Sequence, residues 1–531
     1  MAQLLSGDEA VAAAAYDAGI TLGIGYPGTP STEILEVLEG LGGPAQWAPN
    51  EKVALEVGIG SAASGGRSIV TMKHVGLNVA ADPLFSAALM ELPGALVVIS
   101  ADDPGMASSQ NEQDNRRYAV AAGIPMLEPS DAQEAYGFTL LAIELSEKWH
   151  GPVLLRLTTR VCHSKTLVRR EGMTVPAACT PKYVRNVRGR VMMPGNARVL
   201  HVKLREKLEE IRSWNEKYGP TQTIAGTRSL GIITSGISYQ HVREAAPEAS
   251  VLKLGMTHPL PVEAIRTFAA SVDRLIAVEE GDPYLVESIR TAGIKIEQAP
   301  VQFRFNELNV DRVRRLLAGD TTPDPKPLAG KPPALCPGCP HRNVYTVFRD
   351  KNCIVCGDIG CYSLGALPPF EANDISVCMG ASIGVGLGMR YTMPEKDAKR
   401  VVSIIGDSTF LHSGLTGITD MVYNPPSTGH VVVIVDNSIT AMTGMQENPS
   451  TGRTLSHDKT NKVILEDVCK ALGVKNVHVV DATVDQDGFE KLLDESLAKP
   501  ELTVIINRRV CLLAAKSIKE YEKRDDQICG N

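Results

Sequence analysis

The sequence lacks an excess of positive charge, a long hydrophobic run and a basic start, and each absence excludes a class of protein. Among 531 residues, 54 Lys and Arg stand against 61 Asp and Glu, so the formal charge is −7 and no basic field favours nucleic acid. No apolar run reaches the roughly 18 residues of a membrane span, and the acidic start is unlike a signal peptide. We expect a cytoplasmic protein with no nucleic-acid or membrane partner.

Cysteines are also scarce, at 11 in a chain of which 44% is hydrophobic. Several of them are clustered, which fits metal or redox use in a reducing compartment better than a disulfide scaffold. The length predicts two to four domains.

Short apolar runs rich in Val and Ile recur along the chain, separated by Ala-, Leu- and Glu-rich segments of helical length. This alternation is typical of parallel sheets with helical crossovers, so the predicted fold class is α/β. The runs begin near residues 21, 95, 152, 230, 275, 401, 431 and 503.

Composition also predicts the domain boundaries. From Lys165 to Lys217 there are 13 Lys and Arg against 5 Asp and Glu, and the stretch ends in a probable amphipathic helix. It is either a solvated helix and loop, or a surface for a partner subunit or a phosphorylated ligand. A segment rich in Pro and Gly at 319–338 indicates a second linker. The predicted apolar face of the helix consists of Leu204, Leu208 and Ile211, and the predicted parts are a domain at 1–165, a basic connector at 166–225, and domains at 226–318 and 319–531.

Two neighbouring strands of the last third are each followed by polar residues. Gly406-Asp407-Ser408 follows one predicted strand, and Asp436-Asn437 follows the next, 30 residues on. Parallel strands would present the Asp407 and Asn437 oxygens at their carboxyl ends, where ligands bind in open α/β sheets. Hard oxygen donors beside a glycine suit Mg²⁺ holding a diphosphate. The pair predicts the diphosphate site of a thiamine-diphosphate enzyme.

Such an enzyme also needs a desolvated carboxyl group to hydrogen-bond the aminopyrimidine ring. Glu51 begins an Ala- and Gly-rich helix that follows a short strand, and it is the preferred candidate. Glu56, one turn further on, is the competitor. A glutamate at a helix start also has a simpler role, since its charge complements the helix dipole.

The clustered cysteines leave two kinds of metal site open. Cys336 and Cys339 form a CxxC pair, and a second pair, Cys353 and Cys356, lies 14 residues beyond, so a four-thiolate zinc site is a rival to an iron-sulfur cluster. The second pair lies in a predicted strand, whose alternating side chains would point apart. Cys361 and Cys511 follow strands in turns and could complete a 4Fe-4S cluster.

Nine segments together resemble the alpha subunits of indolepyruvate:ferredoxin oxidoreductases, a branch of the 2-oxoacid:ferredoxin oxidoreductases. The resemblance extends from about residue 5 to about 515, with the motifs in order. The segments are YPGTPSTE (26–33), NEKVALE (50–56), TMKHVGLNVAADPL (71–84), DDPGMASSQNEQDNR (102–116), CPGCPHR (336–342), GDIGCYSLG (357–365), CMGASIGVG (378–386), GDSTFLHSG (406–414) and DNSITAMTG (436–444).

The resemblance implies a role for each matching residue. Glu51 would activate thiamine diphosphate, and Thr29 would contact the substrate carboxylate. Candidate proton-handling or substrate-orienting groups are His74 and His412, because histidine titrates near neutral pH. The implied Mg²⁺ ligands are Asp407, Asn437 and the Ile439 carbonyl, the further cofactor contacts are Gly360, Gly380, Gly406, Ser408 and Thr443, and the implied 4Fe-4S ligands are Cys336, Cys339, Cys361 and Cys511.

The implied reaction is oxidative decarboxylation of an aryl 2-oxo acid such as indolepyruvate to its acyl-CoA, with electrons leaving through the 4Fe-4S cluster. The resemblance also implies two thiamine-diphosphate-binding domains, a transketolase C-terminal-like domain at 226–318, and a smaller partner subunit in a dimer of heterodimers. Family members usually continue into a ferredoxin-like domain, whereas this sequence offers only Cys529 there. Electrons would then pass to ferredoxin or another subunit. The alternatives are a non-oxidative thiamine-dependent decarboxylase and a catalytically silent structural subunit.

Overall fold

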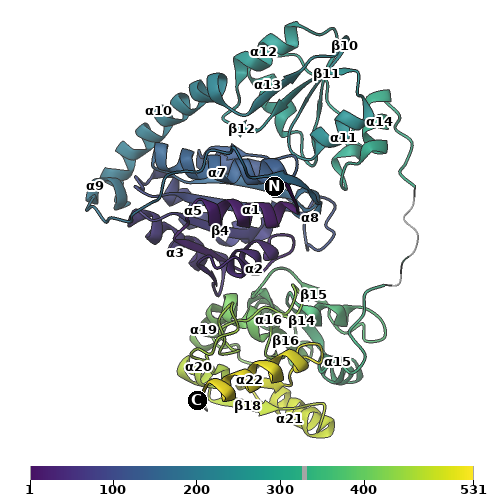
Figure 1. Ribbon diagram of the computed structural model, residues 1–531. Helices are drawn as coiled ribbons and strands as arrows, with labels where there is room; N and C mark the ends of the chain where they lie inside the picture. The colour runs from purple at the N-terminus through teal and green to yellow at the C-terminus, as the bar shows by residue number, and fades with distance from the viewer. Residues whose placement is uncertain (1, 326–329, 331, 530–531) are drawn as a thin grey trace. The chain divides into compact units, whose positions relative to one another are not determined.

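The computed structural model describes residues 2–325, 330 and 332–529, with side chains described as far as residue 525. The side chain of Cys529 lies outside that description. The chain forms two compact units, Met1–Pro325 and Lys326–Asn531, each built around parallel sheets (Figure 1). The predicted second linker, 319–338, has no helix or strand among its described residues.

A seven-stranded sheet forms the centre of the first unit. Its strands run parallel except for the edge strand β12, which pairs antiparallel with β6. A separate antiparallel pair joins β1 (Ala2–Leu5) to β8 (Thr166–Arg169). In sheet order the seven strands are β12 (Met256–His258), β6 (Met126–Leu127), β7 (Val153–Thr158), β5 (Leu96–Asp102), β4 (Ser68–Lys73), β2 (Leu22–Gly25) and β3 (Ala45–Trp47).

Helices cover both faces of this sheet (Figure 1). Helix α1 packs against α2 and α7, and α3 packs against α5. The helices of this part are α1 (Gly7–Asp17), α2 (Thr32–Gly40), α3 (Glu51–Ala63), α4 (His74–Val79), α5 (Ala81–Leu89), α6 (Arg116–Ala122), α7 (Ala132–Trp149) and α8 (Thr159–His163).

A four-stranded sheet completes the first unit, in the order β13 (Leu275–Val278), β10 (Thr227–Thr234), β11 (Ala249–Leu254) and β9 (Thr221–Ile224). The predicted connector contains α9 (Val187–Arg190) and α10 (Pro194–Tyr218), and the predicted apolar face of α10 is buried. The division into three domains stays a prediction. The remaining helices are α11 (Ser238–Ala245), α12 (Val262–Ala270), α13 (Tyr284–Thr291), η1 (Val301–Arg304) and α14 (Val310–Ala318).

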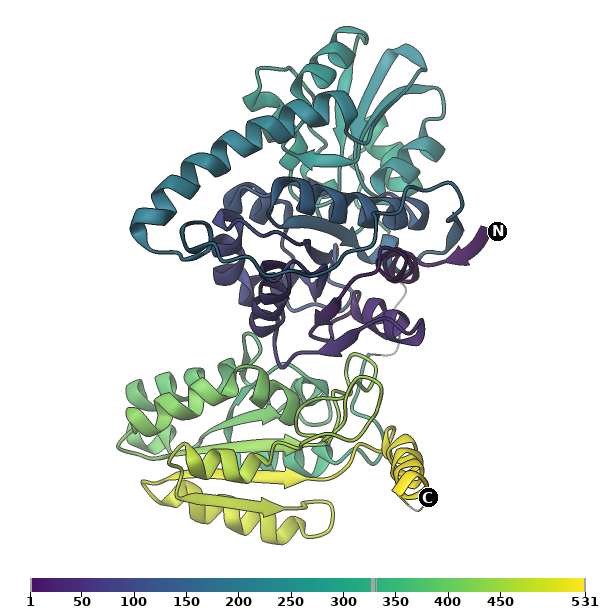
Figure 2. The same cartoon turned by 60° about the vertical axis from the view of Figure 1, so that its left-hand side comes forward.

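The second unit has one six-stranded sheet whose paired strands are all parallel. Its order is β15 (Ile375–Ser376), β14 (Ile354–Gly357), β16 (Val401–Gly406), β17 (His430–Asp436), β19 (Leu502–Arg508) and β18 (Asn476–Val480). One hydrophobic cluster unites one face with α15 and α21, and a second unites the other face with α16, α19 and α20, so helices flank the sheet on both sides (Figure 2). The helices are α15 (His341–Asp350), η2 (Cys361–Ala366), α16 (Ala381–Thr392), α17 (Glu395–Ala398), α18 (Asp407–Thr409), η3 (Phe410–Gly414), α19 (Leu415–Tyr423), α20 (Leu465–Ala471), α21 (Gln486–Ala498) and α22 (Ala515–Cys529).

Each of the eight apolar runs singled out in the sequence contains a strand of a parallel sheet, so the predicted α/β class is confirmed. Strands β5, β7, β16 and β17 are buried along their whole length, as continuous apolar runs covered by helices on both faces require. None of the described helices combines the length and the apolar character needed to cross a membrane.

Candidate functional site

Glu51 lies at the first position of α3, where the prediction placed it. Asn50 caps this helix, with the Val53 amide donating to Asn50 Oδ1 at 2.8 Å. The Glu51 side chain is buried at 5% exposure, and a Cβ built on Gly76 would lie 2.6 Å from Glu51 Oε1. Glu56, the rival candidate, is exposed and pairs with Lys52. Only Glu51 therefore has the desolvated setting that the chemistry requires.

Thr29 lies in the loop after β2, next to the end of β4. The Gly28 amide donates to Thr32 Oγ1 at 3.0 Å, and Gly28 abuts the Lys73 side chain. His74 follows β4 and is fully buried. Its Nε2 lies 3.1 Å from the Asn111 carbonyl oxygen, whereas its Nδ1 has no hydrogen-bond partner among the described residues. The sheet thus gathers Thr29 and His74 at its carboxyl end.

Lys73, the last residue of β4, was not predicted from the sequence. Its Nζ donates to the Ser108 carbonyl oxygen at 2.6 Å, and burial lowers the pKa of Lys73 to about 8. A lysine that ends a buried strand directly before a histidine was the available signal. The group lies beside Gly28 and adds a cation to this edge of the sheet.

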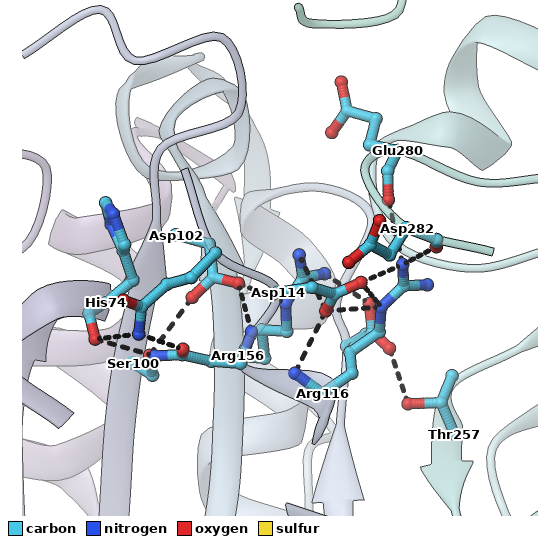
Figure 3. Close-up of polar contacts among 12 residues, drawn as sticks. His74, Ser100, Asp102, Asp114, Arg116, Arg156, Thr257, Glu280 and Asp282 are labelled. Carbon is cyan, nitrogen blue, oxygen red and sulfur yellow. Dashed lines mark hydrogen bonds and ion pairs between the residues drawn. The ribbon is translucent and has the colours of Figure 1, made fainter. Parts of the chain in front are cut away.

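A buried network of arginines and carboxylates holds the segment that follows β5 (Figure 3). Asn115 donates through its side chain to the His74 carbonyl oxygen at 3.0 Å and through its amide to Asp102 Oδ2 at 3.1 Å. Arg156 on β7 donates to Asp102 at 2.8 Å and to Glu128 at 2.8 Å. Through the bond from Asn115, this network holds the backbone of His74 in place.

The same network reaches the part of the first unit that contains the four-stranded sheet. Arg116 donates to Glu279 Oε2 at 2.7 Å and to the Glu280 and Asp282 carbonyl oxygens at 2.9 Å each. Thr257 Oγ1 donates to Glu128 Oε1 at 2.5 Å. Residues far apart in the sequence thus meet in one interior cluster, which local patterns could not reveal.

In the second unit, Asp407 and Asn437 lie at the carboxyl ends of the adjacent parallel strands β16 and β17, where Gly406 is opposite Val435. Asp407 is buried, and Ser450 Oγ donates to its Oδ2 at 3.1 Å. Burial, followed by the charge of Asp436, raises the pKa of Asp407 to about 7.

This donor set fits a hard divalent cation. The Asn437 side chain and Ile439 are also buried, and the Ile439 amide donates to Asn437 Oδ1 at 3.3 Å. Carboxylate, amide and carbonyl oxygens at such a sheet edge suit Mg²⁺ with a diphosphate. A cation would also stabilise the buried charge of Asp407. Ser450 is a neighbour of this site that the sequence analysis did not identify.

The other predicted cofactor residues lie on segments around the same sheet edge. Gly380 directly precedes α16 as its N-cap with a φ of 85°, and a Cβ there would lie 2.4 Å from Ser413 Cβ, so only glycine fits. Thr440 donates to Ser408 Oγ at 2.9 Å, and Thr443 donates to Gln446 at 2.6 Å. His412 is buried within η3, with Nδ1 2.6 Å from Ser413 Oγ. Gly360 directly precedes η2.

The four predicted cluster cysteines lie close enough in the second unit for their charges to interact. Burial, followed by smaller contributions from Cys336, Cys361 and Cys511, raises the pKa of Cys339 to about 11. The Cys511 amide donates to the Asn437 carbonyl oxygen at 3.0 Å. This backbone link joins the cysteine group to the predicted Mg²⁺ ligand.

The spacing of these thiols differs from that of a zinc tetrahedron. Zn–S bonds of about 2.3 Å place sulfur atoms about 3.8 Å apart, whereas no three of these thiols, all within the described chain, lie within 4.8 Å of one another. Cys353 packs into the hydrophobic cluster of one face, and the Cys356 thiol contacts Met389 of α16 on the other. The two cysteines of the second CxxC pair thus point apart, as their strand predicted.

Comparisons with known proteins agree with this geometry. A family model described as pyruvate flavodoxin/ferredoxin oxidoreductase, thiamine diphosphate-binding, matches residues 13–197, and one described as thiamine pyrophosphate enzyme, C-terminal TPP binding domain, matches 358–506. Indolepyruvate oxidoreductase subunit IorA of Archaeoglobus fulgidus is 38% identical over 96% of this chain and 86% of its own length. The protein of that name from Methanothermobacter thermautotrophicus is 37% identical over 97% and 88%.

A solved structure shares the fold. A 2-oxoglutarate:ferredoxin oxidoreductase from Magnetococcus marinus, described with 2-oxoglutarate, coenzyme A and succinyl-CoA bound, aligns with a TM-score of 0.51 at 19% identity, over 60% of this chain and 65% of that one. Fold and site together define a thiamine-diphosphate-dependent oxidoreductase acting on 2-oxo acids. The chain belongs to the IorA family of indolepyruvate oxidoreductase subunits, which confirms the resemblance read from the sequence.

Proposed function

We propose that this chain carries out the oxidative decarboxylation of an aryl 2-oxo acid, such as indolepyruvate, to its acyl-CoA. One observation carries the proposal. Four neighbouring cysteines are linked to the sheet edge of Asp407 and Asn437 by the hydrogen bond from the Cys511 amide to the Asn437 carbonyl oxygen. The printed names of the relatives support indolepyruvate as the substrate.

In the first unit, Glu51 would donate or accept the hydrogen bond that activates thiamine diphosphate. Its burial gives the carboxyl group the desolvated setting that this hydrogen bond requires. Thiamine diphosphate supplies a nucleophilic carbon and an electron sink when bound. Thr29 would bind the substrate carboxylate, and His74, held through its backbone by Asn115, would orient the substrate or move a proton.

In the second unit, Asp407, Asn437 and the Ile439 carbonyl would hold Mg²⁺ and thereby the diphosphate. Gly360, Gly380, Gly406, Ser408 and Thr443 would line that site, and His412 would handle protons or orient substrate. Cys336, Cys339, Cys361 and Cys511 would hold one 4Fe-4S cluster, which passes single electrons.

The chain would act with a smaller partner subunit, in a dimer of heterodimers, with coenzyme A as acyl acceptor. Electrons would pass to ferredoxin or to another accepting subunit. The relatives are themselves named as subunits, which supports an assembly of more than one kind of chain.

Iron and acid-labile sulfide per chain, measured on protein purified without oxygen, test the proposal. We expect about four of each, and we expect Cys336→Ser and Cys339→Ser to lose the iron together with acceptor reduction. Cys179→Ser is the control, since Cys179 belongs to the first unit, where its thiol donates to the Gly65 carbonyl oxygen. Iron near zero in protein that still binds thiamine diphosphate and releases CO₂ would instead identify a non-oxidative decarboxylase.

A further inference from the structure

A second group of metal-binding side chains lies in the first unit, apart from the proposed cofactor residues. Asp8 in the first turn of α1, Glu33 in the first turn of α2 and His163 at the end of α8 each offer one ligand atom, and these atoms lie within 4.8 Å of one another. Three separate elements thus direct one imidazole and two carboxyl groups at a common point.

Among these three side chains, the burial of the Asp8 carboxyl group requires an explanation. Its side chain is buried at 1% exposure, neither carboxyl oxygen makes a hydrogen bond of good geometry among the described residues, and its polar neighbours are the Cys162 thiol and the Glu33 carboxyl group. A buried carboxylate without a partner is costly, and buried polar groups of native proteins are nearly always satisfied. Burial raises the pKa of Asp8 well above its ordinary value, and the nearby charge of Glu33 adds to this effect. Asp8 therefore needs either a retained proton or a cation.

The packing holds the three ligands in place. A Cβ at Gly7 would lie 2.2 Å from the Val161 carbonyl oxygen, so α1 approaches α8 as closely as only glycine allows. Ser6 and Glu9 close a capping box at the start of α1. Both contacts fix Asp8 beside the end of α8. The fully buried Cys162 thiol also adjoins Asp8, whose charge, after burial, raises the pKa of that thiol.

We propose that Asp8, Glu33 and His163 bind a structural Zn²⁺ ion. Zinc accepts a mixture of nitrogen, oxygen and sulfur ligands in four-coordinate sites. The ion compensates the buried charge of Asp8 and ties α1, α2 and α8 together. Because α2 begins three residues after Thr29, the ion also anchors the segment that carries the proposed substrate contact.

Calorimetric titration of Zn²⁺ into the intact chain tests the site. We expect Asp8→Asn and His163→Gln each to weaken one class of Zn²⁺ site by at least about 100-fold, since loss of a ligand exceeds loss of an outer-shell partner. His201→Gln, which changes an exposed histidine of α10, and Glu39→Gln, which changes another glutamate of α2, should leave that class unchanged. A class of Zn²⁺ site that disappears in Cys336→Ser but remains in Asp8→Asn belongs to the thiols of the second unit.

Folding is checked separately by thermal unfolding of the metal-free proteins. Asp8→Asn removes a buried carboxyl group that lacks a hydrogen bond of good geometry, so it should unfold at the same temperature as the parent or higher, while added Zn²⁺ should raise only the parent's midpoint. The inference is wrong if the parent and Asp8→Asn bind the same number of Zn²⁺ ions with the same affinity. Asp8 then holds a proton shared with Glu33 instead of a metal ion.

Discussion

Both units bury aspartates at the carboxyl ends of their parallel sheets, but the neighbours of these aspartates differ. In the first unit, Asp102 pairs with Arg156, which also pairs with Glu128, and all three side chains are almost fully buried. In the second unit, Asp407 accepts a hydrogen bond from the Ser450 hydroxyl and lies near the charge of Asp436. No ion pair of the described residues includes Asp407. The acids of the first cluster are paired with its own arginines, whereas the second cluster is suited to a cation from outside.

The comparison teaches how structural and functional acids can be distinguished. Asp436 has an arginine partner, Arg508, while its neighbour Asp407 has none, so the difference lies within one sheet edge as well as between the units. A buried acid that its own chain leaves uncompensated marks a ligand site.

The largest expected effect is on the first cluster. Arg156→Met leaves Asp102 and Glu128 buried without their cation and should lower the free energy of unfolding by about 3–5 kcal/mol. Urea unfolding of the intact chain measures this. The matched control is Arg228→Met, which removes one member of an ion pair with Asp273 in which both side chains are exposed, and it should cost about 1 kcal/mol or less. Equal losses in the two variants would contradict the structural role of the first cluster.

A pH-dependent effect is expected from Glu280, whose carboxylate turns away from the arginines of the first cluster (Figure 3). Burial raises its pKa from 4.5 to about 7. The folded state therefore binds more protons than the unfolded state between these values, so stability falls by about 1.4 kcal/mol for each pH unit from 4.5 to 7.

Glu280→Gln keeps an acceptor for the Leu308 amide, which donates to Glu280 Oε1 at 2.9 Å, and it removes the titration. We expect the variant to match the parent near pH 4.5 and to exceed it by about 3 kcal/mol at pH 8. Unfolding midpoints at the two pH values measure the difference. A constant offset between the two proteins would show that Glu280 does not titrate in this range.

The acid of the second unit should respond in the opposite way to Asp102. Asp407→Asn should weaken Mg²⁺-dependent thiamine diphosphate binding by about 100-fold, or about 2.7 kcal/mol, without lowering the stability of the cofactor-free chain. Calorimetry and unfolding measure the two properties. Asp102→Asn serves as the comparison, because it should lower stability by removing a partner of Arg156. A stability loss in Asp407→Asn would place it with the structural acids.

The smallest effect is expected at an exposed pair. Lys52 and Glu56 are both nearly half exposed on α3, so Lys52→Met should change the free energy of unfolding by less than about 0.5 kcal/mol. Urea unfolding in low salt measures this value. A loss as large as that of Arg156→Met would mean that burial does not decide the contribution of these ion pairs.

The sequence predicts those features that depend on local pattern. Buried strands that end in Gly406-Asp407 and Asp436-Asn437 were identifiable because apolar runs and the residues after them are contiguous. Glu51 was favoured over Glu56 for the same reason, through its place at a helix start. The grouping of Cys336, Cys339, Cys361 and Cys511 came from the family resemblance, because spacing alone left zinc and iron-sulfur both open.

The remaining features depend on residues that only the fold brings together. Arg116 and Glu279 are 163 positions apart, and neither residue has a local pattern that names its partner. Asp8, Glu33 and His163 each look like an ordinary polar residue at a helix end. Lys73 was visible within a motif, but its lowered pKa follows from burial, which needs the packed structure.

The position of edge strand β12 in the sequence affects how the seven-stranded sheet forms while the chain is being synthesised. It pairs with β6, yet it lies about 130 residues further along the chain. At the roughly 5–20 residues per second of translation, a ribosome needs about 6 to 26 seconds after β6 emerges to deliver its partner. Throughout that interval the edge of β6 stays open to other strands, so the nascent chain is most prone to aggregate before residue 258 has been made.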